Sequence, residues 1–171
     1  FDCFHVPTKL RRFYRKHTFD LKIDNAFESV VRACRVGRPE WISEFQVQLY
    51  VELFDRGCAH SIEAWQDGKL AGGLYGVSLG GAFFGESMFS RETDASKVAL
   101  VSLVARLNAG GYALLDTQFN TEHLKRFGAQ TISQQLYRER LDQAVEINAD
   151  FFALPEGVAG DQLLQSITQT S

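Results

Sequence analysis

The sequence predicts an α+β fold in which an antiparallel β-meander is followed by a long buried helix, another strand and further helices. Residues 60–89 form strand-like segments separated by turn signals, and residues 98–107 are almost continuously apolar. With 171 residues, 45% hydrophobic and 23% charged, the chain can bury one core. We therefore expect one domain over residues 1–152. Residues 153–171 are rich in Gly, Gln, Ser and Thr, which predicts a weakly ordered tail.

Two helices are expected before the meander. Phe27, Val30, Val31 and Cys34 follow the spacing i, i+3, i+4, i+7, which buries one face of a helix ending near residues 37–39. A second helix is expected to start at Ser43, where residues 43 and 46 have the pattern of a capping box, and to end at residue 57.

The meander is expected to contain three antiparallel strands. Residues 60–65 alternate in polarity, and Asp67-Gly68 then supplies the backbone angles of a tight hairpin turn. Residues 70–77 form the next strand, residues 78–81 a turn, and residues 82–89 the returning strand.

The second half of the chain predicts mostly helices. Asp94 can cap the apolar helix over residues 98–107, which Gly110 and Gly111 end. Residues 112–119 are expected to be a buried strand, 121–127 a short helix, 129–132 a strand and 133–144 an amphipathic helix. This order of elements matches the GNAT-like architecture of acyl-CoA N-acyltransferases, although architecture alone names no reaction.

Several classes of protein are disfavoured. Apolar stretches are interrupted well before about 18 residues, so no membrane span is expected. The sequence has neither a signal peptide nor an initial Met, and such a start is typical of a trimmed chain. The cysteines and histidines lack metal-ligand spacing, so we expect no metal and no cofactor. The cysteines fit free thiols in a reducing cytoplasm. The cysteines and histidines are Cys3, Cys34, Cys58, His5, His17, His60 and His123.

A basic cluster stands out near the start of a chain whose net charge is −3 and whose pI is about 5.8. Its members are Lys9, Arg11, Arg12, Arg15 and Lys16. Basic side chains interleaved with aromatic ones are typical of a surface that faces nucleic-acid phosphates. A solvated helix or loop face would give the same pattern.

Three nucleotide or nucleophile motifs are weak. Residues 72–76 are Gly-rich but lack the Lys-Ser/Thr ending of a P-loop, so a packed hairpin is the better interpretation. Ser87 lacks the second Gly of a nucleophile elbow. Residues 90–97 contain no Gly and two acids, whereas a coenzyme A pyrophosphate needs exposed backbone amides at the start of the long helix. Acyl-CoA is therefore a disfavoured donor.

Asp116 and Gln118 form the strongest candidate catalytic pair. They stand two apart on a predicted strand, so both side chains are expected to leave the same face at the strand end. A carboxylate among apolar residues must be hydrogen-bonded. The alternative to a catalytic role is therefore that Asp116 caps the end of the strand.

Beyond these features, the sequence resembles the leucyl/phenylalanyl-tRNA–protein transferase family from about residue 4 to residue 141. The resemblance rests on a set of motifs in the family's order and spacing: Trp41-Ile42, His60-Ser61-Ile62-Glu63, Gly72-Gly73-Leu74-Tyr75-Gly76, Gly85-Glu86-Ser87-Met88-Phe89-Ser90, Ala95-Ser96-Lys97, Asp116-Thr117-Gln118, His123-Leu124 and Gly128-Ala129. Thr117 replaces the family's usual Cys and Gln134 a frequent Arg. The family's N-terminal Tyr-Arg-x-Gly-x-Phe-Pro and Trp-Trp-Ser-Pro motifs have no counterpart ahead of Phe1.

The resemblance implies transfer of Leu or Phe, and of Met as well, from aminoacyl-tRNA to a protein that begins with Arg or Lys. This reaction marks proteins for N-end rule degradation and takes place in the cytoplasm without metal or ATP. We expect the Gln118 amide oxygen to accept a hydrogen bond from the attacking amine, while Asp116 orients Gln118 and stabilises developing positive charge.

The resemblance also implies the substrate-binding residues. Leu74, Phe83, Leu100, Leu103 and Leu115 would line the pocket for the donor's side chain, although all five could simply be core. Glu86 would pair with the acceptor's cationic side chain, or with a surface cation. Trp41 and Tyr50 would stack on the terminal adenosine or lie in the core. The basic cluster would contact the tRNA.

Two other functions stay open at this point. The order of elements is compatible with a small-molecule N-acyltransferase that uses acyl-CoA, and stoichiometric coenzyme A binding would favour it. A non-catalytic RNA- or peptide-binding relative would bind its ligand without turnover.

Overall fold

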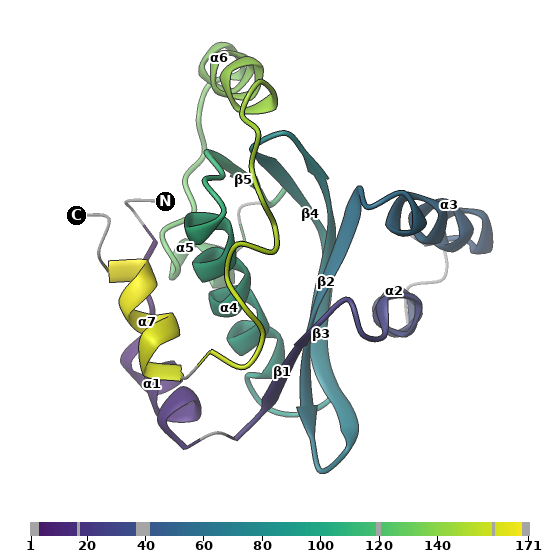
Figure 1. The fold of residues 1–171 in the computed structure, drawn as a ribbon, viewed down its shortest axis with the longest axis vertical. Coiled ribbons are helices and arrows are strands. Elements are labelled where there is room, and N and C mark those ends of the chain that lie inside the picture. Colours follow the sequence, from purple (N-terminus) through teal and green to yellow (C-terminus); the bar gives the residue numbers. More distant parts are fainter. Residues whose placement is uncertain (1–3, 17, 37–41, 119–120, 159, 169–171) are drawn as a thin grey trace.

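The protein is described by a computed structural model, which covers residues 4–16, 18–36, 42–118, 121–158 and 160–168. Its centre is a five-stranded sheet in the order β1-β2-β3-β4-β5 (Figure 1). The strands are β1 (Asp20–Ile23), β2 (Ala59–Gln66), β3 (Lys69–Leu79), β4 (Ala82–Ser90) and β5 (Leu114–Asp116). The first four are antiparallel, and β5 runs parallel to β4.

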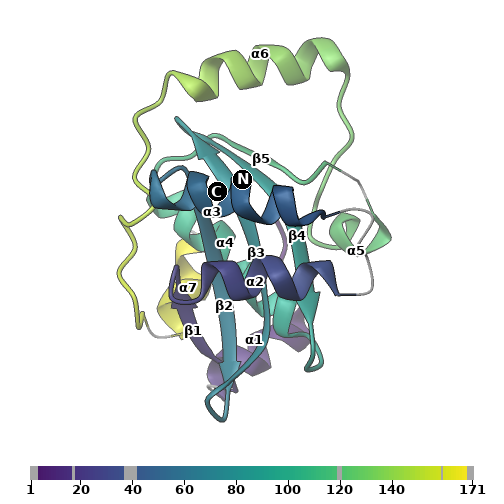
Figure 2. The ribbon, with the colours of Figure 1, turned by 90° about the vertical axis from the view of Figure 1, so that its right-hand side faces the viewer.

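Helices cover both faces of this sheet (Figures 1 and 2). One face carries α4 (Ala95–Ala109), with α1 (Thr8–Arg15) and α7 (Gly160–Thr168) packed outside it and α5 (Glu122–Lys125) beside it. The other face carries α2 (Phe27–Arg35) and α3 (Glu44–Asp55). The α6 helix (Gln134–Val145) lies across the end of the sheet near β4 and β5.

The continuous apolar pattern of α4 follows from its place in the middle layer. The sheet lies on one side of it and α1 and α7 on the other, so residues around its whole circumference are buried. Leu103 and Leu107, for example, are nearly inaccessible to solvent. A smaller core between the sheet and the α2/α3 pair includes Val30, Val47 and Tyr75.

From α2 to β4 the described elements follow the predictions closely. The capping box is present, because the Ser43 hydroxyl accepts from the Gln46 amide and the Gln46 side chain accepts from the Ser43 amide. Asp67 and Gly68 both have positive φ in the hairpin turn, as expected.

Asp94 takes the N-cap position of α4 in a left-handed conformation, but its side chain makes no capping hydrogen bond. Instead its buried carboxylate pairs with Lys97 and with Lys9 of α1. Burial alone would raise the pKa of Asp94, but hydrogen bonds from these two lysines outweigh it and lower the pKa. Asp94 therefore ties α1 to the start of α4 rather than capping the helix.

Two other expectations were wrong. Of the strand expected over residues 112–119, the described residues form only β5, and residues 129–132 form no strand. The expected weakly ordered tail contains α7, whose Leu163 and Ile167 are buried in the main core. The sequence analysis also missed β1 and treated α1 only as a charged surface.

Gly76 lies at an irregularity in the β3–β4 register, where the two strands approach unusually closely. An added Cβ would lie 2.3 Å from the Phe84 carbonyl oxygen and 2.4 Å from the Phe83 ring. We expect Gly76→Ala to reduce the free energy of unfolding by about 1–3 kcal/mol, measured by urea denaturation. Gly85→Ala is the control, because its Cβ would meet nothing closer than 3.4 Å. Equal stability of the two variants would contradict this packing.

Candidate active site

The candidate site lies where the sheet opens between β4 and β5. The two strands pair only from Ala82↔Leu114 to Phe84↔Asp116, after which β4 continues and the chain leaves the sheet. A cavity of about 290 Å³ occupies this opening. Because the parallel pairing of β4 and β5 ends before β4 does, the strand ends are free to hold a ligand, as the carboxyl ends of strands do in α/β proteins.

The cavity is apolar inside and polar at its rim. Four of the five residues expected to bind the donor side chain line it: Leu74 of β3, Leu100 and Leu103 of α4 and Leu115 of β5. Met88 and Leu124 complete the apolar wall, and the remaining lining residues include Glu86, Thr117, Thr121 and His123. Such a cavity can accept an uncharged side chain of moderate size and place the attached polar atoms at the rim.

Asp116 and Gln118 lie at this rim, but not as two residues on one face of a strand. Asp116 is the last residue of β5, and Gln118 lies beyond it with a φ of 60°. The turn is held by the Asp116 carboxylate, whose Oδ1 accepts from the Gln118 backbone amide at 2.7 Å. Its Oδ2 accepts from the Tyr137 hydroxyl, also at 2.7 Å. Asp116 thus fixes the backbone that carries Gln118.

Glu86 holds the side chain of Gln118. The Gln118 Nε2 donates to Glu86 Oε2 at 3.0 Å, and the Tyr50 hydroxyl donates to the same oxygen at 2.8 Å. A carboxylate can only accept, so the amide group must turn its NH₂ towards Glu86. The Gln118 amide oxygen and the second oxygen of Glu86 are left without a hydrogen-bond partner among the described residues.

Tyr50 and Tyr137 remain hydrogen-bond donors at neutral pH. Burial, and then the hydrogen bond to Glu86, raises the pKa of Tyr50 well above its ordinary value. Burial and the hydrogen bond to Asp116 raise the pKa of Tyr137 to about 12. Burial, followed by the charges of Lys97 and Arg126, lowers the pKa of His123, so the imidazole at the rim is neutral at pH 7.

Phe83 and Tyr50 pack in or against the core, which was the alternative for both, and Trp41 cannot be placed. Phe83 is fully buried and stacks on Phe151 beneath the site, so it belongs to the core and not to the cavity lining. Tyr50 packs edge-on against Tyr75 and bonds to Glu86. Trp41 lies outside the described residues.

The site also contains residues that the sequence analysis did not identify. Tyr137 is 21 positions from Asp116 in the chain and reaches it from α6. Met88, Thr121 and His123 line the cavity. Met88 and His123 belong to motifs that carried the resemblance, which was the available signal, whereas Tyr137 gave none.

The motif at residues 60–63 is structural. Glu63 is completely buried and accepts from the Ala26 amide, the Ser61 hydroxyl and the Trp65 indole at 2.7–3.0 Å. His60 bonds to Asp24 at 2.7 Å. These contacts join β2 to the turn before α2, away from the cavity.

The basic cluster is spread around the outside of α1. Leu10 and Tyr14 are buried against α4, and the Tyr14 hydroxyl donates to the Val98 carbonyl. Lys9, Arg12, Arg15 and Lys16 are exposed, and Arg11 is half-buried. Four of the five cluster residues line a surface hollow with Thr8: Lys9, Arg11, Arg12 and Arg15.

The start of α4 is poorly suited to a pyrophosphate. The Arg91 and Glu92 amides both donate to the Ala71 carbonyl at 2.7 and 3.0 Å, and the Ser96 amide donates to the Ser90 hydroxyl at 2.9 Å. The buried Asp94 carboxylate occupies the same helix end. Backbone amides that would bind phosphate oxygens are therefore already used, next to a negative charge.

The described residues form neither a metal site nor a membrane-spanning helix. No group of His, Cys, Asp and Glu side chains is arranged to hold a metal ion. Among the helices described by the structure, none is both long and apolar enough to cross a membrane.

Comparison with solved structures supports the fold. The chain is similar to a ribosomal-protein-alanine N-acetyltransferase from Brucella melitensis biovar Abortus 2308, with a TM-score of 0.52 and 13% sequence identity. The match covers 68% of this chain and 94% of that chain. The predicted GNAT-like α+β fold is thereby confirmed, and at this identity the match bears on the fold alone.

Comparison of sequences identifies the family. A family model described as leucyl/phenylalanyl-tRNA protein transferase matches residues 1–142. The protein of that name from Maricaulis maris is 57% identical over 174 residues, covering 99% of this chain and 81% of that protein. The one from Paramagnetospirillum magneticum is 61% identical over 154 residues, covering 88% and 74%. The chain therefore belongs to the leucyl/phenylalanyl-tRNA–protein transferase family.

Proposed function

We propose that this chain transfers Leu or Phe, with Met tolerated, from aminoacyl-tRNA to the N-terminal Arg or Lys of an acceptor protein. The observation that carries the proposal is the Gln118 amide, which Glu86 and Asp116 hold at the rim of an apolar cavity. A charged tRNA as donor places the activity in the cytoplasm. The product would carry an N-terminus that directs the acceptor protein to degradation.

The reaction exchanges an ester for an amide. The α-amine of the acceptor attacks the ester carbonyl of the donor, the new C–N bond forms, and the bond to the 3′ oxygen breaks. The amine loses a proton and the departing 3′ oxygen gains one. Because the ester is already activated, orientation of the two substrates supplies much of the catalysis.

Gln118 directs the amine. With its NH₂ engaged by Glu86, its amide oxygen accepts a hydrogen bond from the attacking amine and keeps the nitrogen lone pair aimed at the ester. The amide stays neutral throughout, so Gln118 positions the nucleophile and does not take its proton. Asp116 anchors the Gln118 backbone, and its negative charge stabilises the positive charge that develops on the amine.

The cavity and Glu86 select the two substrates. Leu74, Leu100, Leu103 and Leu115 receive the donor side chain, where a charged group would lose its hydration without compensation. The Glu86 oxygen that makes no internal hydrogen bond pairs with the cationic side chain of the acceptor. Glu86 therefore has two tasks: one oxygen holds Gln118 and the other binds the acceptor.

The basic cluster supplies phosphate contacts for the tRNA. Lys9 of α1 lies beside the start of α4, and Leu100 and Leu103, further along α4, line the cavity. A tRNA bound along α1 could thus present its 3′ end from the α4 side. Binding should weaken as salt rises, because each phosphate contact releases counterions.

The transfer rate should rise with pH as the acceptor amine loses its proton. A free α-amine titrates at about 7.7 to 8.0. Because their pKa values are raised, Tyr50 and Tyr137 keep their protons through this range and should cause no fall in rate up to pH 9. Single-turnover rates with pre-bound aminoacyl-tRNA would measure the profile, and a descending limb below pH 9 would contradict the assigned donors.

The donor class can be tested directly. The chain should transfer Leu from Leu-tRNA to a peptide that begins with Arg, and should transfer no acetyl group from acetyl-CoA to the same peptide. The occupied amides at the start of α4 are the reason for the second expectation. Acetyl transfer without Leu transfer would replace the proposal by an acyl-CoA-dependent reaction, and tRNA binding without either would indicate a non-catalytic relative.

A further inference from the structure

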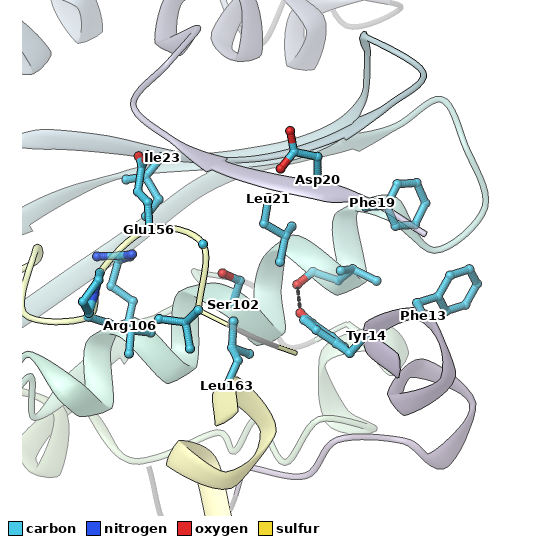
Figure 3. A pocket seen from close by; sticks show the side chains of 15 residues that line it. Phe13, Tyr14, Phe19, Asp20, Leu21, Ile23, Ser102, Arg106, Glu156 and Leu163 are labelled. Atoms are coloured by element: carbon cyan, nitrogen blue, oxygen red, sulfur yellow. Dashed lines mark hydrogen bonds between the residues drawn. The ribbon is translucent and has the colours of Figure 1, made fainter. Parts of the chain in front are cut away.

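A second cavity lies in another part of the molecule, between β1, α1, α4 and the segment that leads into α7 (Figure 3). Its volume is about 190 Å³. None of its lining residues also lines the cavity between β4 and β5. The proposed transfer reaction therefore gives it no role.

The wall of this cavity is part apolar and part polar, with aromatic and aliphatic side chains forming the apolar part. Phe13 and Phe19 stack on each other at 5.8 Å between ring centres on one side. Leu21 points from β1 towards α4, whereas Asp20 points to the opposite side of the strand (Figure 3). Leu163 of α7 closes the wall from below. A compact hydrocarbon group would fit these surroundings.

Arg106 is the cationic side chain in this lining. It is only 2% exposed and reaches from α4 towards Ile23 of β1 and the segment carrying Glu156 (Figure 3). Its Nη1 donates to the Phe151 carbonyl at 2.7 Å, and the guanidinium lies 5.4 Å from the centre of the Phe151 ring. These contacts fix the position of the guanidinium without neutralising it.

The charge of Arg106 is incompletely satisfied. Its Nε is buried and has no hydrogen-bond partner in the described part of the chain. Glu156, Asp24 and Asp150 act on it through space, but burial outweighs them and lowers the pKa of Arg106. The guanidinium nevertheless stays protonated, because its ordinary pKa is above 12. A buried cation with an unused donor beside a cavity is suited to a carboxylate.

We propose that this cavity binds a small monocarboxylate with a compact apolar body, such as an arylacetate or a branched-chain fatty acid. The carboxylate pairs with Arg106, and the apolar body lies among Phe13, Phe19 and Leu21. The Ser102 hydroxyl, which also lines the cavity, offers a second donor. Arg106 is the single cation of the lining, and Asp20 and Glu156 add negative charge to it, so phosphate esters with two charges fit less well.

Glu156 competes with such a ligand. It lies on the exposed segment that closes the cavity, and its negative charge already acts on Arg106. Removing this charge leaves the cavity walls in place and makes the Arg106 site more attractive to an anion. Glu156→Gln is therefore expected to strengthen carboxylate binding, which a purely structural role of Arg106 would not predict.

Calorimetric titration of the chain with phenylacetate tests the proposal. Phenylacetate should bind with 1:1 stoichiometry, whereas phenylacetamide, which lacks the charge, and acetate, which lacks the ring, should bind at least about ten-fold more weakly. Equal binding of phenylacetate and phenylacetamide, or no binding of phenylacetate, would overturn the proposal.

Variants then locate the binding. Glu156→Gln should tighten phenylacetate binding by about two- to five-fold, and Ser102→Leu, which fills the cavity without touching the guanidinium, should abolish it. Arg106→Gln should weaken phenylacetate binding by at least about ten-fold. If Arg106→Gln does not fold, Glu156→Gln and Ser102→Leu still test the proposal.

Leu115→Trp, which fills the donor cavity instead, should leave phenylacetate binding unchanged. Loss of binding in Leu115→Trp but not in Ser102→Leu would place the ligand in the active site and refute the second site.

Discussion

Gln118→Ala is expected to lower the single-turnover rate of Leu transfer by about 10²- to 10³-fold, while binding of Leu-tRNA stays within a few-fold. In the proposed mechanism the amide oxygen is the acceptor that aims the amine, and it contacts neither the tRNA body nor the donor side chain. Its removal also releases Glu86 Oε2 from one of its two hydrogen bonds. The loss should therefore appear in the rate of the chemical step.

A matched substitution separates this effect from general damage. Gln135→Ala removes a similar side chain from the exposed face of α6, where, among the described residues, it donates only to Glu139 at 3.0 Å. This variant should transfer Leu at the rate of the unmodified chain. If Gln118→Ala also retained the full rate, the amide would not position the amine and the catalytic assignment would be wrong.

Leu115→Asp is expected to reduce kcat/KM for Leu-tRNA and Phe-tRNA by at least about 10²-fold, since even one methylene in such a cavity is worth about 1–3 kcal/mol. Leu115 lines the cavity from β5, one residue before Asp116. A carboxylate there would either remain charged against the donor's hydrocarbon or become protonated at a cost to binding.

Leu115→Met is the control for this change. It conserves volume and apolar character, so transfer should fall by no more than a few-fold. Initial rates with Leu-tRNA and Phe-tRNA at several concentrations measure both variants. If Leu115→Asp kept its preference for Leu and Phe, the donor side chain would have to bind elsewhere.

Local sequence signals were sufficient for most of the sheet and for the helices that pack on it. The capping box at Ser43, the Asp67-Gly68 turn and the apolar run of α4 each specify a local structure that the fold retains. By contrast, β1 has four residues and is stabilised by pairing with β2, a contact across some forty residues of sequence. The α7 helix likewise depends on packing against α1 and α4.

The site was predictable to the extent that its residues lie in recognisable motifs. Asp116, Gln118 and Glu86 could be selected, but their geometry could not, because Gln118 leaves the strand with positive φ. Tyr137 meets Asp116 only through the placement of α6 across the end of the sheet. The sequence could not decide between cavity lining and core for Phe83, because an apolar residue beside a cavity and one in the core below it look the same in sequence.

Transfer of labelled Leu from Leu-tRNA to peptides differing only in their first residue tests the central claim most directly. The chain should label a peptide beginning with Arg and leave a peptide beginning with Glu unlabelled, because the free oxygen of Glu86 attracts a cation and repels an acid. Labelling of both peptides alike, or of neither although Leu-tRNA binds, would contradict the account.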